Sequence, residues 1–421
     1  MRRALPFVVL ALLAPAASPG QGSHEVSIDI SKQGGRIRIH CESLGTPEPS
    51  GGEPTSVQAS QVLANDLDQS GVFAVSHGGS AEDSTDAQAV VGGGWSVSGR
   101  KVHLAGEVRD LPGRRPILIR DYRGTLDNWR QLVHQFADDI VLQFTGESGV
   151  ARTRIAFITQ EGRDKELHVM DLDGVGLQAL TADHSIALSP AWSPDGSLLL
   201  FTSYRSAGPR LWVTHSNGGK AYLISGRPGI NTSACYSPDG REIACTLSQD
   251  GNTEIYLLDA RGESPRRLTH ERGIDTSPCW APTGRELAFT SDRDGTPQVY
   301  LMDRDGGNVR RLTYELNYTD SPAWSPKGDR LAFVARTGGG FDIYVCLADG
   351  RDLRAVVTGG SNENPRWSPD GRHLVFASNR DGAGALYVTD LDDRPPRKLV
   401  TGGLRATSPA WSPYPAAAHS P

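Results

Sequence analysis

The chain has 421 residues, of which 38% are hydrophobic and 22% charged, and its formal net charge is −6. That length exceeds what one hydrophobic core usually organises, so we expect at least two domains. The acidic balance gives no basis for nucleic-acid binding, which depends on a basic face. No stretch approaches the ~20 apolar residues of a membrane-spanning helix, so we expect no membrane-embedded segment.

The first residues have the pattern of an export signal. Arg2 and Arg3 precede a short apolar run, Leu5–Leu13, and Ala14-Pro-Ala16 resembles a signal-peptidase site. We therefore predict a signal peptide over residues 1–20 and a mature chain that is exported and soluble. The alternative is an N-terminal anchor that stays uncleaved, which the shortness of the apolar run disfavours.

Five cysteines are an odd number for an exported protein, so at least one of them cannot pair within the chain. Cys235 and Cys279 share a position in neighbouring repeats, and Cys245 lies across a predicted turn from Cys235. A disulfide is one interpretation; burial as small apolar side chains in strands is the favoured one. No C-x-x-C pair occurs, so we assign no metal to these residues.

Residues 24–146 predict a small α/β domain, followed by a short polar linker over residues 147–153. Two amphipathic helices are expected, over Ser56–Ser70 and Asp127–Phe144, each followed by a glycine suited to a helix end. A polar loop is expected over Gly45–Pro54. Alternating or apolar runs predict strands at Val26–Ile30, Val72–Val75, Ala89–Val91, Lys101–Val108 and Pro116–Tyr122.

Residues 154–414 are dominated by one repeated phrase, which reads Ser-Pro-Ala-Trp-Ser-Pro-Asp-Gly in its first copy. Its aromatic position recurs at intervals of 44, 44, 44, 43 and 44 residues. A period in this range is typical of a ring or stack of identical supersecondary units. The six aromatic residues are Trp192, Tyr236, Trp280, Trp324, Trp367 and Trp411.

Each repeat predicts four antiparallel strands, A to D, which is the content of one β-propeller blade. The first unit, beginning at Arg154, lacks its strand A, and the last phrase, Ser408–Pro413, has no blade behind it. We therefore predict that this last strand completes the first blade and closes a six-bladed ring. The fold class is then a multidomain chain, with a small N-terminal α/β domain before an all-β propeller, and residues 415–421 form a disordered tail.

The sequence offers little for catalysis or metal binding, and we assign no catalytic residue, metal or cofactor. Asp-x-Asp-Gly runs begin at Asp171, Asp292 and Asp303, but hairpin turns explain them better than calcium loops. Neither a G-x-S-x-G elbow nor an H-E-x-x-H motif is present. Two alternatives stay open: an exported propeller enzyme, such as a lactonase or glycan-cleaving protein, and an accessory propeller of a peptidase.

Small polar residues precede the aromatic phrase in most repeats, where we expect the loops that join strand D of one blade to strand A of the next. These D–A loops should open on one face of the ring, around its axis. Capping of strand A is one role for these residues, and binding a peptide or loop of a partner is the other. The candidates for partner contact are Thr232, Ser233, Asp275, Thr276, Asp320 and Asn362.

The combination resembles the TolB family of periplasmic proteins in the Tol-Pal envelope system. In the first domain the likeness rests on the segment Leu63–Phe73 and on Ala89-Val-Val-Gly-Gly. In the propeller it rests on the repeated phrase, on Ser291-Asp-Arg-Asp-Gly and on the ending Pro409-Ala-Trp-Ser-Pro-Tyr414. The segment from Cys41 to Pro54 departs from the family pattern.

The resemblance implies a periplasmic scaffold without catalytic activity that supports outer-membrane integrity and envelope constriction at cell division. Its implied partners are the peptidoglycan-associated lipoprotein Pal, bound on the D–A face, and inner-membrane Tol proteins such as TolA, and we expect a monomer. Ser233 and Thr276 are the foremost candidates for Pal contacts. The implied N-terminal contact segment comprises Glu25, Val26, Ile28 and Ile30.

Overall fold

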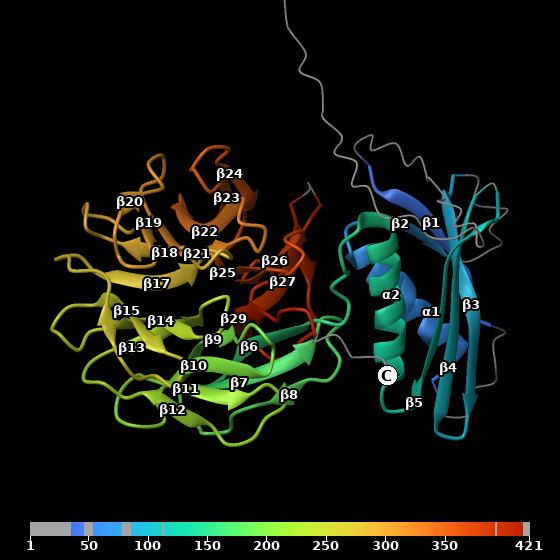
Figure 1. Cartoon of the computed structure of the whole chain (residues 1–421), viewed down its shortest axis with the longest axis horizontal. Coiled ribbons are helices and arrows are strands. Elements are labelled where there is room, and N and C mark those ends of the chain that lie inside the picture. Colours follow the sequence, from blue (N-terminus) through green and yellow to red (C-terminus); the bar gives the residue numbers. More distant parts are fainter. Residues whose placement is uncertain (1–34, 46–53, 78–85, 112, 392–393, 416–421) are drawn as a thin grey trace, which may run out of the picture. The chain divides into compact units, whose positions relative to one another are not determined.

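The computed structural model describes residues 35–45, 54–77, 86–111, 113–391 and 394–415 (Figure 1). The expected signal peptide, the strand Val26–Ile30 and the N-terminal contact segment with Glu25 and Ile28 lie outside the described residues, as does most of the loop expected before Pro54. None of the described helices is long and apolar enough to cross a membrane.

The first domain is a five-stranded sheet with two helices. The strand order is β2-β1-β3-β4-β5; β1 runs parallel to both β2 and β3, and β3, β4 and β5 form an antiparallel meander. The elements are β1 (Ile37–Cys41), α1 (Ser56–Gln69), β2 (Phe73–His77), β3 (Ala89–Ser98), β4 (Lys101–Asp110), β5 (Pro116–Thr125) and α2 (Trp129–Thr145).

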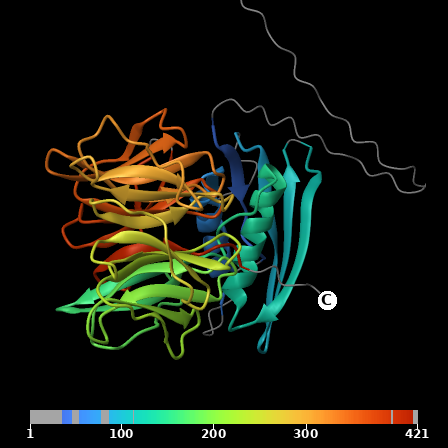
Figure 2. The same ribbon diagram turned by 60° about the vertical axis from the view of Figure 1, so that its left-hand side comes forward.

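Both helices have identifiable ends. Thr55 and Gln58 form a capping box at the start of α1, each accepting a hydrogen bond from the other's backbone N–H. Helix α2 ends at Gly146, whose φ of 76° is the left-handed conformation that favours glycine. The helices pack on the sheet, with α2 along β4 and β5 (Figure 2). Gly106 on β4 allows this approach, because a Cβ there would lie 2.5 Å from the Phe136 ring.

The sequence therefore predicts both helices to within two residues at each end. It predicts β3, β4 and β5 with the correct first residue but too early an end, and β2 with a start one residue early and an end two residues early. It missed β1, which forms the centre of the parallel part of the sheet. The alternation of Ile37, Ile39 and Cys41 was the signal that could have identified it.

The propeller has six four-stranded antiparallel blades, as the repeat predicts (Figure 1). From the inner strand A to the outer strand D, the blades are: first, β29 (Ala406–Trp411), β6 (Arg154–Glu161), β7 (Asp164–Asp171) and β8 (Gln178–Ala179); second, β9 (Ala187–Trp192), β10 (Leu198–Ser203), β11 (Arg210–His215) and β12 (Tyr222–Ser225); third, β13 (Asn231–Tyr236), β14 (Glu242–Leu247), β15 (Glu254–Asp259) and β16 (Arg266–Arg267); fourth, β17 (Asp275–Trp280), β18 (Glu286–Ser291), β19 (Gln298–Asp303) and β20 (Arg310–Arg311); fifth, β21 (Thr319–Trp324), β22 (Arg330–Thr337), β23 (Gly340–Leu347) and β24 (Arg354–Val357); sixth, β25 (Asn362–Trp367), β26 (His373–Ser378), β27 (Ala385–Asp390) and β28 (Arg397–Lys398).

The C-terminal strand closes the ring. β29 pairs with β6, placing Ala406 opposite Thr159 and Trp411 opposite Ile155. The indole nitrogen of Trp411 donates to the hydroxyl of Thr153, just before β6, over 2.8 Å. The predicted closure is confirmed, and it leaves no inner strand of the described propeller without a neighbour in its own blade.

The repeated aromatic residues pack between blades, as expected. Trp280 belongs to a cluster with Ala244 and Ile255 of the third blade and with Leu287 of its own blade. Trp367 is buried in the same way, and its indole nitrogen donates to the carbonyl of Ala323 on the preceding inner strand over 3.0 Å. The phrase therefore stabilises the contacts between neighbouring blades.

Every inner strand contains a bulge at the same position. The register with strand B shifts there, as it does in β17 between Thr276 and Cys279. Five of the six bulges have proline as their second residue, which cannot donate to the ladder; the bulge of β13 has Ala234 there. The first residue of every bulge has a positive φ although it is not glycine. These six residues, with φ between 49° and 55°, are Ser189, Ser233, Ser277, Ser321, Asn364 and Ser408.

Candidate functional site

A cavity of about 420 Å³ lies between the six inner strands and forms the central channel of the propeller. Its wall is built by the bulges and the aromatic phrases, which supply mostly small polar, proline and aromatic side chains. Five tryptophans line it, and all five belong to the repeated phrase. The bulge residues Ser189, Ser233, Ser277, Ser321 and Asn364 also line this channel.

The predicted partner-contact residues lie in the first halves of the inner strands β13, β17, β21 and β25, rather than on the loops before them. The reason is that the ladder resumes on both sides of each bulge, so that Thr276 still pairs with Thr290. Thr232, Ser233, Thr276 and Asp320 are half-buried, and of these four only Ser233 lines the channel.

Asp275 and Asn362 are completely buried, and both hold an arginine in place. Asp275 accepts a hydrogen bond from Arg293 over 2.9 Å, and Asn362 accepts one from Arg380 over 2.9 Å. Burial raises the pKa of Asp275, while hydrogen bonds from Ser291 and the charge of Arg293 oppose that rise. These two buried residues therefore position arginine side chains on the D–A side without being exposed themselves.

The arginines held in this way stack on aromatic rings of their own blades. The guanidinium of Arg293 lies 5.4 Å from the Phe289 ring centre and 4.9 Å from that of Tyr300. Arg380 is placed similarly over Phe376 and Tyr387. Cation–π contacts and buried hydrogen bonds fix these side chains, so the D–A side of the blades is rigid.

Thr232 and Asp320 are bonded to the neighbouring blade. The hydroxyl of Thr202 in the second blade donates to that of Thr232 over 3.1 Å. The hydroxyl of Thr290 in the fourth blade donates to a carboxylate oxygen of Asp320 over 2.8 Å. Strand-A positions at this face therefore tie adjacent blades together while keeping part of their surface exposed.

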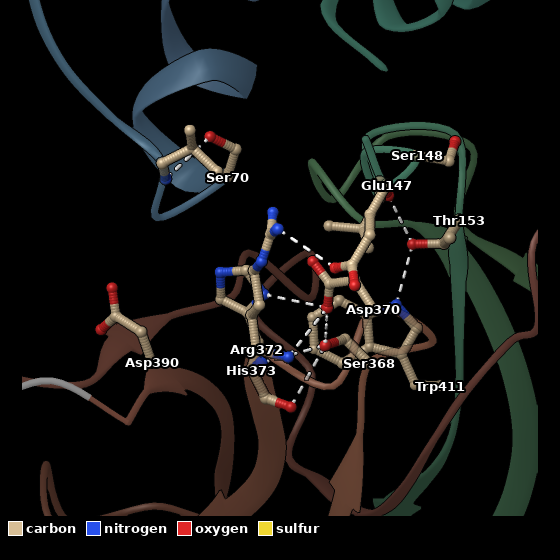
Figure 3. Close-up of polar contacts among 12 residues, drawn as sticks. Ser70, Glu147, Ser148, Thr153, Ser368, Asp370, Arg372, His373, Asp390 and Trp411 are labelled. Atoms are coloured by element: carbon tan, nitrogen blue, oxygen red, sulfur yellow. Dashed lines mark hydrogen bonds and ion pairs between the residues drawn. The ribbon is translucent and has the colours of Figure 1, made fainter. Parts of the chain in front are cut away.

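The first domain and the linker contact the other side of the propeller. The carboxylate of Glu147 accepts a hydrogen bond from Arg372 over 3.1 Å (Figure 3) and one from Lys327 over 3.0 Å. Arg372 and Lys327 both lie in turns between strands A and B. Arg36 and Arg130 pair with Asp390 and Asp173, which lie beside turns between strands C and D. Because strand direction alternates, A–B and C–D turns share the face opposite the D–A loops.

His373 lies beneath this contact and is nearly buried (Figure 3). Its Nδ1 is 3.6 Å from an oxygen of Asp370, which in turn accepts a hydrogen bond from Ser368. A Cβ at Gly71, two residues after the end of α1, would lie 3.2 Å from Nε2 of His373. The His373 ring centre is 6.1 Å from that of Trp411. The His373 side chain therefore lies between the first domain and the closing strand β29.

The described residues contain no group of three or more histidine, cysteine, aspartate or glutamate side chains arranged to hold a metal ion. All five cysteines are free. Burial raises the pKa of the Cys245 thiol to about 12, so it is an apolar, protonated group at neutral pH.

A model of the TolB β-propeller domain matches residues 141–415. The chain belongs to this family. Among curated relatives, it is 38% identical to the Tol-Pal system protein TolB of Desulfosudis oleivorans over 34% of this chain and 33% of the relative. It is 34% identical to TolB of Cereibacter sphaeroides over 53% of this chain and 55% of the relative. The aligned regions thus span about a third to about half of these relatives' lengths.

The likeness to a solved TolB structure extends beyond the propeller. The crystal structure of TolB from Acinetobacter baumannii superposes with a TM-score of 0.80 at 25% identity, covering 90% of this chain and 97% of that one. The TolB arrangement of a small α/β domain before six blades is therefore present here.

Within this TolB-family propeller, sequence reasoning missed the side chains that project into the channel. The position before the aromatic residue carries Cys235, Cys279 and Arg366 in three blades and alanine in the other three. The departure from the repeat could have identified them. Where several repeats carry alanine at one position, a different residue at that position indicates a role other than the common packing.

Proposed function

We propose that the protein is a periplasmic scaffold of the Tol-Pal system, which binds the peptidoglycan-associated lipoprotein Pal through the D–A side of its propeller. We further propose that inner-membrane Tol proteins, TolA among them, bind its N-terminal region. The family match and the Tol-Pal names of its relatives support the assignment. In this proposal the protein contributes to outer-membrane integrity and to constriction at division, and it has no catalytic step.

One observation carries the choice of face. The ion pairs between the first domain and the propeller use A–B and C–D turns, with Glu147, Arg36 and Arg130 on the domain and linker side. The D–A side is left uncovered by the described residues. It is also the rigid side, because Arg293 and Arg380 are held by buried partners. A rigid, uncovered polar surface binds a partner with little ordering cost.

Among the candidates, Thr232, Ser233 and Thr276 are proposed as direct contacts because they are half-buried rather than enclosed. Asp320 is proposed as a contact through Oδ2, which Thr290 does not bind and to which the Tyr318 hydroxyl donates over 3.4 Å. Asp275 and Asn362 are proposed to act indirectly, by holding the arginines beneath the surface.

The N-terminal part of the proposal rests on sequence. Residues 1–20 are proposed as the signal peptide that brings the chain to the periplasm, and Glu25, Val26, Ile28 and Ile30 as the contact segment for the inner-membrane partner. A pulldown of TolA by the mature chain, compared with a chain lacking residues 24–30, tests this part.

The test of the propeller face is Thr276→Arg. A long charged side chain at this half-buried position should weaken capture of the soluble domain of Pal at least about tenfold, because a poorly placed charge costs more than 1.4 kcal/mol at an interface. The matched control is Thr283→Arg, in the exposed A–B turn of the same blade, which should bind Pal normally. Both variants should keep the melting temperature of the wild type.

The result that would refute the proposal is clear. If the folded wild-type protein captures no Pal from envelope fractions, the scaffold role fails. If Thr276→Arg lowers binding and melting temperature together, Thr276 is a structural residue rather than a contact residue. A stoichiometric metal ion in the purified protein would instead favour the alternative of a propeller enzyme.

A further inference from the structure

Arg366 is the one charged residue that lines the central channel among the described residues. It lies on β25, directly before Trp367, and directly after the bulge of that strand. The other five blades carry a small neutral residue at this position. These are Ala191, Cys235, Cys279, Ala323 and Ala410.

The guanidinium of Arg366 has no carboxylate partner among the described residues. Nη1 donates to the carbonyl of Pro365 over 3.0 Å, which leaves its other donors uncommitted. The inner strands do carry three acids, but all precede the bulge and are bonded elsewhere. The pairs are Asp275 with Arg293, Asp320 with Thr290, and Glu363 with Ser361.

The charge of Arg366 acts across the channel. Burial raises the pKa of the thiols of Cys235 and Cys279, and the positive charge of Arg366 lowers it. Those thiols belong to the third and fourth blades, whereas Arg366 belongs to the sixth. Arg366 and both cysteines line the channel, so the guanidinium faces a neutral wall of hydroxyl, thiol and aromatic groups.

We propose that the central channel is a carboxylate-binding site anchored by Arg366. A guanidinium offers a planar pair of donors that matches a carboxylate, and the pair is stronger in a partly desolvated cavity than in water. The hydroxyls of Ser233, Ser277 and Ser321 line the same cavity and can bond further polar atoms of the ligand. A volume of about 420 Å³ lies in the range of small-ligand pockets, and exceeds what a single carboxylate needs.

Two sources could supply this carboxylate: a small organic acid, or an acidic side chain of a segment inserted by a partner. The second source rests on the proposed partner-binding function, and the first is independent of it. The shared chemistry is a carboxylate on the Arg366 guanidinium, in a channel that repels metal cations because of the same charge.

Titration with sodium succinate tests the site itself. Five tryptophans line the channel, so their fluorescence should report binding. Wild type should show a saturable change in the millimolar range that neither sodium chloride at equal ionic strength nor neutral succinamide produces. Arg366→Ala should weaken it about tenfold or more, because a charge-assisted pair is lost. This variant introduces the residue already present in three blades, so it should fold.

The matched control is Arg351→Ala, which removes an exposed arginine from a C–D turn of the fifth blade. It should bind succinate as the wild type does. The proposal is overturned if Arg366→Ala binds succinate as tightly as wild type, or if succinamide or chloride reproduces the wild-type change.

Capture of Pal by the same variants distinguishes the two sources. If Arg366→Ala weakens both succinate and Pal binding, and succinate competes with Pal, the carboxylate belongs to the partner. If only succinate binding weakens, the ligand is a free organic acid, and the site is still supported. If wild type captures no Pal, the proposed function fails, while the succinate titration still decides whether the channel binds carboxylates.

Discussion

Nδ1 of His134 on α2 lies 2.6 Å from Oδ2 of Asp66 on α1, and Nε2 of the same ring lies 3.3 Å from Oδ2 of Asp173 in the first blade. The ring is completely buried. Burial by itself would lower the pKa of His134, but the two carboxylates raise it to about 10. A positively charged imidazole therefore joins both helices of the first domain to the propeller at neutral pH.

His134→Gln should lower the free energy of unfolding by about 3–5 kcal/mol near pH 7, because it leaves the buried carboxylate of Asp66 without its cation. The pKa of His134 in the folded protein lies above its ordinary value of 6.5, so its stabilisation is full below about pH 6.5 and is lost as pH rises through 10. Urea unfolding of both proteins between pH 7 and 10 should show the difference shrinking. His184→Gln, at an exposed histidine, is the control, and a difference that stays constant with pH contradicts the assignment.

Trp411 and Trp280 occupy the same position in different blades but differ in hydrogen bonding. The indole nitrogen of Trp411 donates to Thr153, whereas that of Trp280 is buried without a partner. Trp411→Phe should therefore cost about 1 kcal/mol more stability than Trp280→Phe, since only the first leaves an acceptor without its donor. Melting temperatures of the two variants check this, and equal losses would mean that packing alone sets the role of the aromatic residue.

Ser277 has a φ of 53°, a conformation that is costly for β-branched residues and free of strain for glycine. Ser277→Val should destabilise the protein by about 1–2 kcal/mol, and Ser277→Gly should stay within about 1 kcal/mol of the wild type. Chemical denaturation measures both. If valine were tolerated as well as glycine, the bulges would not be under the backbone constraint described above.

Gly106 lies against the ring of Phe136, which a Cβ at this position would approach to 2.5 Å. Gly106→Ala should therefore cost about 1–3 kcal/mol through overpacking between β4 and α2. Gly99→Ala is the counterpart for a turn glycine with open space around it: any loss there reflects only its φ of 58°. If Gly106→Ala is no worse than Gly99→Ala, the helix and sheet are looser than the structure indicates.

The sequence predicts the ring and its closure because the period, the missing first strand and the unpaired last phrase are all local patterns. The sequence does not predict which of two neighbouring polar residues in a repeat is buried. Asp275 and Thr276 are neighbouring polar residues, yet Arg293, eighteen residues later, folds back to pair with Asp275 and makes no hydrogen bond with Thr276. Similarly, nothing local says that Arg366 faces the axis, because that depends on six strands meeting around it.

The pairing of Ala406 with Thr159 has a consequence for how the protein reaches its fold. The two strands that must meet stand at opposite ends of the propeller sequence, so the first blade is completed only after all the others have been made. Contacts this distant along a chain form slowly, because closing the intervening loop costs conformational entropy. Until then the edge of β6 is open to pairing with other chains. The propeller is therefore most vulnerable to misassembly just before its last six-residue strand arrives.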